Sequence, residues 1–400
     1  RLTATTHSAT TTSAASSELF MGVGSGRIAD SVLEAMAVQP PAADDPAFLE
    51  AFAECLMSLR TVLGISRGQA FVIPGSGTHG MEMLAVSLLR PGSRAVVGCT
   101  GRWGERWAEI CRRHGIHARC VVPSPGESVR PAHVARVVSD IDADALLLTH
   151  VDPSTGVRVD VEACAAACRR SGALVMVDGV CAAGAEVVRQ NDWGVDLYLT
   201  TGQRGLGVPG GLILMGAGDR AIRRLRAREW SPRTYSLDLQ PWLGAMDAIA
   251  CETPSYHQSP AGNLVLALRE GLRLVLAEGL DQRAARHAVV ANVLRAGLEV
   301  LGFLPVVPNP EARALGISVC YYPKGRGREF LDLVRRFGVR LRGGTHPTLG
   351  ERTFQIGHLG NVGVVDAGRT LESLAKASGG PSGSMRAGDG GPDRTTPLFA

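Results

Sequence analysis

Short apolar runs alternate with segments of helical periodicity along most of the chain, and this alternation limits the possible folds more than any other feature. Runs with the length and composition of buried strands cover residues 70–73, 94–97, 118–122, 145–148, 174–177 and 197–200. Helical segments follow several of them, at 81–89, 103–113 and 161–170. Strands that alternate with helices typically form a parallel sheet with crossover helices. The pattern predicts an α/β fold that binds ligands at the carboxyl ends of its strands.

From about residue 261 the pattern changes to two long amphipathic helices followed by a compact α+β segment. The expected elements are helices at 263–278, 280–301, 328–337 and 367–377 and strands at 316–322, 339–342 and 353–356. We therefore predict a large domain over 21–260 and a smaller C-terminal domain over 261–378. The flanking segments 1–20 and 379–400 are rich in Ser, Thr, Gly and Pro and are expected to be disordered tails.

Composition excludes several broad classes of protein. No stretch approaches the roughly 18 consecutive apolar residues of a membrane span, and 42 basic residues nearly balance 38 acidic ones. The odd number of cysteines, nine in all, argues against a disulfide framework. His114 and His117 have poor spacing for zinc and lack further ligands, so no metal site is predicted. We expect a cytoplasmic protein with reduced thiols that binds neither nucleic acid nor a membrane.

Lysine is nearly absent from the chain. Among the 42 basic residues only Lys324 and Lys376 are lysines, and the remainder are arginines. Both lysines lie in the predicted small domain. Any chemistry that needs a primary amine from the protein has only these two sources.

Three features at strand ends could together hold a cofactor. The glycine-rich turn at 75–80 joins a strand to a helix, where free N–H groups and the helix dipole suit a phosphate. Trp103 and Asp178 also stand at strand ends, and a further glycine-rich segment follows at 200–211. An indole can stack on a planar ring, and a carboxylate can keep a ring nitrogen protonated. Each feature also has a purely structural interpretation, as an ordinary turn, a core Trp or a helix cap.

The order and spacing of six motifs resemble the class V aminotransferases of pyridoxal-phosphate fold type I, in particular the alanine–glyoxylate and serine–pyruvate branch. The motifs are GSGTHGMEML (75–84), GRWGERW (101–107), LLLTHVDPSTGV (146–157), LVMVDGVCAAGA (174–185), TTGQRGLGVPGG (200–211) and YHQSPAGN (256–263). The similarity runs from about residue 21 to 377. It implies an α/β fold with a mainly parallel seven-stranded sheet in the large domain, a smaller C-terminal α+β domain, and pyridoxal 5'-phosphate as the cofactor.

The resemblance also implies a role for individual residues. Ser76, Gly77 and Thr78 would hold the phosphate. Trp103 would stack on the pyridine ring, Asp178 would pair with its nitrogen, and Gln203 would add a phosphate-side contact. Tyr256 and Ser259 would reach the phosphate of the partner subunit, which implies a homodimer with sites shared across the interface.

The chain departs from the family pattern at the groups that carry the reaction. Arg204 follows Gln203 where the family has its Schiff-base lysine, and a guanidinium stays charged and is a poor nucleophile. Gln355 stands where the family has the arginine that binds the substrate carboxylate. Pro153 lies where a hydroxyl residue is expected. These changes predict that the pocket is kept and the reaction altered.

Three interpretations remain open. In the first, the protein binds pyridoxal phosphate or its aminated form noncovalently and acts on a small amino-acid or keto-acid-like ligand, with His79 or His150 as the base or Arg204 as an electrostatic anchor. In the second, it is a noncatalytic subunit that pairs with a lysine-bearing relative. In the third, the pocket serves another ligand.

Overall fold

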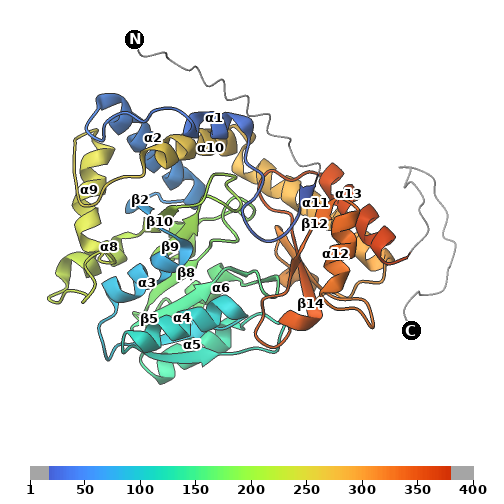
Figure 1. Ribbon diagram of the computed structural model, residues 1–400. Coiled ribbons are helices and arrows are strands. Elements are labelled where there is room, and N and C mark those ends of the chain that lie inside the picture. Colours follow the sequence, from blue (N-terminus) through green and yellow to red (C-terminus); the bar gives the residue numbers. More distant parts are fainter. Residues whose placement is uncertain (1–17, 380–400) are drawn as a thin grey trace, which may run out of the picture.

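The computed structural model describes residues 18–379. The tails predicted at 1–20 and 379–400 fall almost wholly outside this range. Between the tails, the structure combines a large part built on one sheet and a smaller C-terminal part (Figure 1). The division at residue 260 stays a prediction.

A seven-stranded sheet forms the centre of the large part. Its strand order is β2 (Gln69–Pro74), β10 (Leu212–Ala217), β9 (Leu197–Thr201), β8 (Leu174–Asp178), β5 (Ala145–Thr149), β3 (Arg94–Gly98) and β4 (His117–Val121). Only β10 is antiparallel to its neighbours. The predicted α/β class and the mainly parallel seven-stranded sheet are confirmed, and each of the six predicted strands is present.

Helices cover both faces of this sheet, which explains why its central strands are buried throughout. The covering helices include α3 (Gly77–Leu88), α4 (Arg102–Arg113), α5 (Pro131–Asp140) and α6 (Val161–Cys168). Within this set, α3 packs on α4 and α5 packs on α6. The predicted helix at 81–89 begins four residues earlier, at Gly77, because Ser76 caps it.

Shorter elements and peripheral helices complete the large part. They are α1 (Asp30–Met36), α2 (Pro46–Leu63), β6 (Val151–Asp152), β7 (Val157–Arg158), α7 (Gln190–Trp193), α8 (Asp219–Ala227) and α9 (Gln240–Ala250). The hairpin of β6 and β7 follows directly on β5 at the edge where the parallel strands end.

The smaller part has its own hydrophobic core. Helices α10 (Gly262–Glu278) and α11 (Leu280–Val300) lead into it. Its further elements are η1 (Pro310–Ala312), β11 (Ile317–Tyr321), α12 (Glu329–Arg336), β12 (Val339–Arg340), β13 (Arg342–Gly343), η2 (Gly350–Arg352), β14 (Thr353–Gly357) and α13 (Val364–Ala377). The aromatic rings of Phe303, Phe330 and Phe354 pack together at its centre.

The strand expected at 339–342 is divided into two. β12 pairs with β1 (Leu19–Phe20), whereas β13 pairs with β14, and the buried Leu341 separates the two segments. The start of the described chain therefore packs on the C-terminal part, and Met21 belongs to its core.

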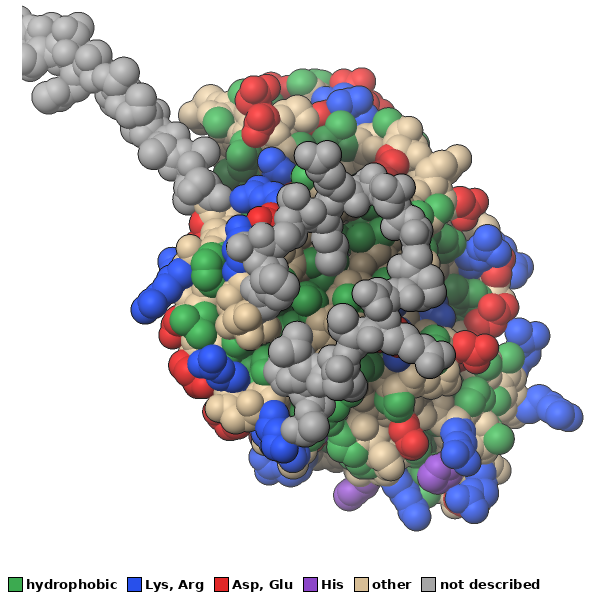
Figure 2. Space-filling model, turned by 90° about the vertical axis from the view of Figure 1, so that its right-hand side faces the viewer, with side chains coloured by type: hydrophobic (Ala, Val, Ile, Leu, Met, Phe, Trp, Pro, Cys, Tyr) green, Lys and Arg blue, Asp and Glu red, His purple; other side chains and the backbone are tan. Residues whose placement is uncertain are grey.

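None of the helices within residues 18–379 is long and apolar enough to cross a membrane. On the face shown in Figure 2, basic and acidic side chains are interspersed with apolar ones. All nine cysteines are free, and no cluster of metal-ligating side chains occurs among the residues described.

Gly179 allows the close approach of two strands beneath the candidate site, and this generates a prediction. A Cβ at this position would lie 2.1 Å from the ring of the fully buried Tyr198. We expect Gly179→Ala to lower the free energy of unfolding by about 1–3 kcal/mol, because the packed ring cannot move away. Gly368→Ala is the control, since its Cβ meets no atom within 4 Å in α13 and should raise stability by about 0.5–1 kcal/mol. Urea unfolding of the two variants measures both effects, and equal stabilities would contradict the prediction.

Candidate active site

The residues predicted to hold a cofactor converge at the carboxyl edge of the sheet. Asp178 ends β8, Ser76 lies between β2 and α3, and Trp103 lies in the first turn of α4 after β3. Since these strands run parallel, their ends meet at one edge. The structure therefore brings together features that are up to about a hundred residues apart in the chain.

The start of α3 has the features of an anion seat. Ser76 Oγ accepts a hydrogen bond from the His79 backbone N–H at 3.3 Å, and His79 Nδ1 accepts one from the Ser76 N–H at 3.4 Å. This capping box holds both side chains at the helix start. The first N–H groups, those of Gly77 and Thr78, have no carbonyl to bond within the helix. A Cβ on Gly77 would lie 3.0 Å from Val180, so a larger residue would crowd the seat.

Arg106, which is not among the predicted site residues, joins this site. Its Nη1 donates to Thr78 Oγ1 at 2.8 Å, and its guanidinium lies 5.4 Å from the centre of the Trp103 ring. Residues three apart on a helix share a face, so the spacing from Trp103 could have indicated this position. A positive charge is therefore placed between the anion seat and the indole.

Asp178 is the buried acid of the site, with 2% of its surface exposed. Its Oδ1 accepts a hydrogen bond from the Val180 N–H at 3.0 Å. Burial raises the pKa of this carboxyl to about 6, and the negative charge of Asp152 also raises it, while Arg106 and Arg204 lower it. A cationic group placed beside Asp178 would favour the ionised carboxylate.

Several buried polar atoms near Asp178 lack a hydrogen-bond partner among the residues described. They are Thr149 Oγ1, Thr201 Oγ1, Gln203 Oε1 and Arg204 Nε. Thr149 is in register with Asp178 on the neighbouring strand, so the two side chains emerge on the same face. Because buried polar groups in proteins are normally paired, this group of atoms indicates a polar ligand at the edge.

Arg204 connects the edge of the sheet to the segment between β1 and α1. Its Nη1 donates to the Gly24 carbonyl at 2.7 Å, and its charge acts on Asp178. Neither lysine belongs to this edge: Lys324 is in an exposed turn after β11, and Lys376 on α13 pairs with Glu372 at 2.6 Å. The described site thus has a guanidinium and no primary amine.

Gln355 is buried on β14 and contributes its amide to a link between the two parts of the molecule. Its Nε2 donates to the Pro153 carbonyl at 2.6 Å and to Thr345 Oγ1 at 2.9 Å. Pro153 lies in the turn between β6 and β7. The amide group is therefore engaged within the protein.

The β6–β7 turn also caps α4. Asp152 Oδ2 accepts from the Trp103 N–H at 3.0 Å, and Ser154 Oγ accepts from the Arg102 N–H at 3.0 Å. A Cβ on Gly101 would lie 2.4 Å from Ser154 Oγ, so this close approach requires glycine. Asp152, which is not among the predicted site residues, is fully buried and helps to set the position of Trp103.

His150 does not join the cluster around Asp178. Its Nδ1 lies 2.8 Å from the Tyr198 hydroxyl, and its ring contacts Trp193 edge-on. Side chains alternate along a strand, so His150 lies on the opposite face from Thr149. Burial lowers the pKa of its imidazole to about 3, which keeps the ring neutral.

Tyr256 and Ser259 lie at the surface, in the segment between α9 and α10. The Tyr256 side chain is 75% exposed, and its hydroxyl lies 3.5 Å from Ser259 Oγ. In this single chain they are available to a second molecule.

Comparisons with known proteins agree with this geometry. The model of the aminotransferase class-V family matches residues 46–359. The L-aspartate–glyoxylate aminotransferase of Paracoccus denitrificans is 29% identical over 82% of this chain and 83% of its own length. The alanine–glyoxylate aminotransferase of Mus musculus is 28% identical over 90% of this chain and 87% of its own.

A solved structure extends the similarity to three dimensions. The alanine–glyoxylate aminotransferase from Nostoc sp. superposes with a TM-score of 0.85 at 29% identity, over 90% of this chain and 95% of that one. The matched range includes the anion seat, the indole, the buried acid and Arg204. The chain therefore belongs to the class V aminotransferase family and is similar to its alanine–glyoxylate branch.

Proposed function

We propose that the protein binds pyridoxal 5'-phosphate, the cofactor of its family, or the aminated form of this cofactor, without a covalent bond, and that its chemistry differs from ordinary transamination. The observation that carries this proposal is the convergence of the anion seat, Trp103 and Asp178 beside Arg204, at an edge that has no lysine. By the family motif, Arg204 takes the position of the lysine.

The residues present fit the cofactor. The start of α3 and Arg106 would hold the phosphate, Trp103 would cover the ring, and Asp178 would face its nitrogen. The unpartnered buried atoms at this edge support a polar occupant. When bound, the cofactor supplies an electron sink for reactions at a carbon that carries an amino group.

The protein's own groups have separate tasks in this proposal. Asp178 keeps a proton on the ring nitrogen, since a nearby carboxylate raises that nitrogen's pKa. Trp103 excludes water from one face of the ring. Arg204 supplies a fixed positive charge but cannot exchange a proton at neutral pH. His79 is exposed at the seat and remains the candidate base, whereas the neutral, buried His150 has a structural role.

The substrate end of the site is also altered. The amide of Gln355 cannot form the paired charged hydrogen bonds that a guanidinium gives a carboxylate. It is also engaged with Pro153 and Thr345. A small amino acid or keto acid should therefore bind less tightly here than in relatives that have arginine.

A homodimer would complete the site. The exposed Tyr256 and Ser259 would reach the cofactor phosphate of the partner subunit, as the family pattern implies. Their exposure also supports the second candidate, in which this chain is a noncatalytic subunit that completes the site of a lysine-bearing relative. Co-purification with such a relative would favour that candidate. Recruitment of the pocket for another ligand is the third candidate, and it requires that pyridoxal phosphate does not bind.

Reduction with borohydride tests the noncovalent mode. The wild-type protein mixed with pyridoxal phosphate should show a visible absorption band, yet its mass after reduction should stay unchanged because no amine is within reach. Arg204→Lys should gain the mass of one reduced cofactor, as measured by mass spectrometry.

Two control variants make this result specific. Arg204→Gln lacks an amine and should behave like the wild type. Arg204→Lys combined with Lys324→Arg should still be labelled. Stoichiometric labelling of the wild type, or no binding of the cofactor at all, would overturn the proposal.

The pH dependence of cofactor affinity tests Asp178. Its pKa of about 6 means that the carboxyl takes up a proton as the pH falls from 8 to 5, and the ring nitrogen then loses its ionised partner. We expect affinity to fall by about tenfold over this range. In Asp178→Asn this component should vanish, and only the titration of the cofactor itself should remain. Identical profiles in a fluorescence titration would exclude this role.

Alanine–glyoxylate turnover tests the altered chemistry. The wild type should show no normal turnover, and Arg204→Lys should restore only weak activity because Gln355 does not grip the carboxylate. Adding Gln355→Arg to Arg204→Lys should improve kcat/KM by roughly 10- to 100-fold over the single change. Pyruvate release measures these rates, and a robust wild-type rate would refute the prediction.

A further inference from the structure

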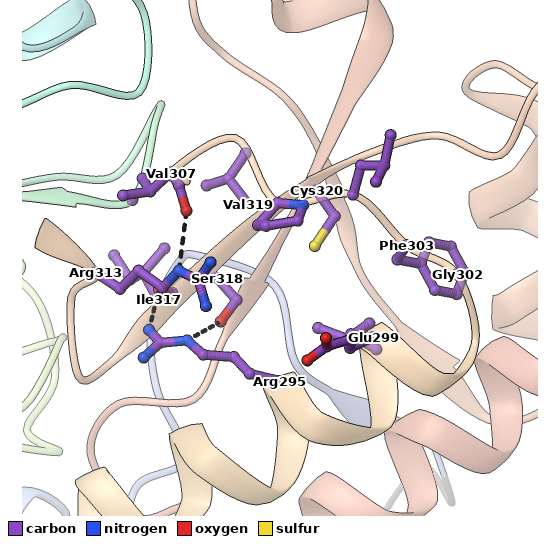
Figure 3. Close-up of a pocket in the computed structure, with 14 residues that line it drawn as sticks. Arg295, Glu299, Gly302, Phe303, Val307, Arg313, Ile317, Ser318, Val319 and Cys320 are labelled. Atoms are coloured by element: carbon purple, nitrogen blue, oxygen red, sulfur yellow. Dashed lines mark hydrogen bonds between the residues drawn. The ribbon is translucent and has the colours of Figure 1, made fainter. Parts of the chain in front are cut away.

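A separate cavity lies between the last turns of α11, the segment 302–307 and β11. Its volume is about 280 Å³. Figure 3 shows the side chains that line it, with Cys320 pointing into the space from β11. Small-molecule sites begin at about 300 Å³, so the cavity suits one small molecule and not a nucleotide.

Two arginines form one end of the cavity. Arg295 donates from Nε to Ser318 Oγ at 3.3 Å, and Arg313 donates from Nε to the Val307 carbonyl at 2.9 Å. Further bonds to backbone carbonyls hold each guanidinium in place. None of the salt bridges found within residues 18–379 includes either group. Two fixed guanidiniums without a carboxylate partner can accept an anion.

Electrostatics at this end also favour an anion. Burial lowers the pKa of Arg295 to about 10, and the positive charge of Arg313 lowers it further in the same direction. Glu186 opposes this effect, but it is engaged by Arg158 and by the Leu315 N–H. A ligand carboxylate would relieve the repulsion between the two arginines.

An acidic side chain and several apolar side chains form the rest of the lining. Glu299 lies one helical turn after Arg295 on α11, and Phe303 follows the end of the helix. Figure 3 shows the Glu299 carboxylate between Arg295 and Phe303. The wall beyond it is apolar, with Leu298 and Val319. The lining therefore combines two guanidiniums, the exposed carboxylate of Glu299 and an apolar wall.

We propose that this cavity binds a free α-amino acid with an apolar side chain. Arg295 and Arg313 would bind its carboxylate, Glu299 its ammonium group, and the wall near Phe303 its side chain. In such a molecule the carboxylate, the ammonium group and the side chain are all bonded to one carbon atom, and each would face one of these three parts of the lining. A simple carboxylate would leave Glu299 without a partner beside a negative ligand, and a simple amine would leave the two arginines unpaired. The site is distinct from the sheet edge that holds Asp178, and the inference does not depend on the proposed cofactor chemistry.

Calorimetry with L-leucine and the cofactor-free full chain tests this inference. We expect one leucine to bind per chain. Both 4-methylpentanoate, which lacks the ammonium group, and 3-methylbutylamine, which lacks the carboxylate, should bind at least tenfold more weakly. Absence of leucine binding, or equal binding of the three probes, would overturn the proposal.

Variants locate the bound leucine. Arg313→Gln should weaken binding at least tenfold, and Glu299→Gln should weaken leucine but not 4-methylpentanoate. Arg119→Gln, an exposed arginine on β4, and Asp178→Asn at the sheet edge should both bind leucine as the wild type does. Loss of binding in Asp178→Asn with full binding in Arg313→Gln would place leucine at the sheet edge and refute the proposal.

A further variant tests the site without removing the hydrogen bonds that Arg295 and Arg313 make within the protein. Cys320→Met retains both arginines and fills part of the cavity from a position that faces it. It should weaken leucine binding at least tenfold while the melting temperature shows that the chain is folded. Unchanged affinity in this folded variant would also contradict the assignment.

Discussion

The burial of one carboxylate, Asp178, is the constraint on which the arrangement of the candidate site depends. An ionised carboxylate inside a protein is costly unless cations or hydrogen bonds compensate for it. Here the compensation is incomplete: Val180 supplies a hydrogen bond, and Arg106 and Arg204 act through their charge. The surroundings therefore suit a cationic ring nitrogen. Arg106 lies on α4, which follows β3, and Arg204 lies in the segment after β9, on the other side of β8. Because both guanidiniums act on Asp178, the position of this acid is linked to the positions of α4 and of the segment after β9.

The β6–β7 hairpin connects the start of α4 to the C-terminal part of the molecule. Asp152 caps α4 and holds Trp103, the Pro153 carbonyl accepts the amide of Gln355 from β14, and the Gly156 carbonyl accepts the Ala314 N–H at 3.1 Å. Gly156 also lines the cavity beside α11. Residues 152–156 thus contact the backbone of Trp103, the C-terminal sheet and the cavity.

The parts of the fold that could be predicted from the sequence are those set by local pattern. Apolar runs of four or five residues indicate the buried strands, and the motif order indicates their arrangement. The division of 339–342 could not be read from the sequence, because Leu341 is apolar like its strand neighbours and only the pairing of β12 with β1 distinguishes the two segments. In the site, spacing placed Ser76, Trp103 and Asp178 at one edge. Spacing did not reveal Arg106, because its hydrogen-bond partner Thr78 is 28 residues away in the sequence. It also did not reveal the direction in which the His150 side chain points, because that direction depends on where β5 ends.

Arginine is so common in this chain that its presence at position 204 needs to be separated from a general preference for arginine over lysine. A general preference for arginine over lysine explains an arginine at any single basic position. On the surface, exchanging one of these residues for the other would have no chemical consequence. At the sheet edge the two side chains differ in kind: a guanidinium can reach the Gly24 carbonyl and hold the segment around that residue, whereas a buried lysine could lose its proton and react. Gln355 differs from Arg204 in kind, because its amide carries no charge and its Nε2 already donates to the Pro153 carbonyl and to Thr345 Oγ1. The edge therefore has one fixed positive charge at Arg204 and a neutral, internally bonded amide at Gln355.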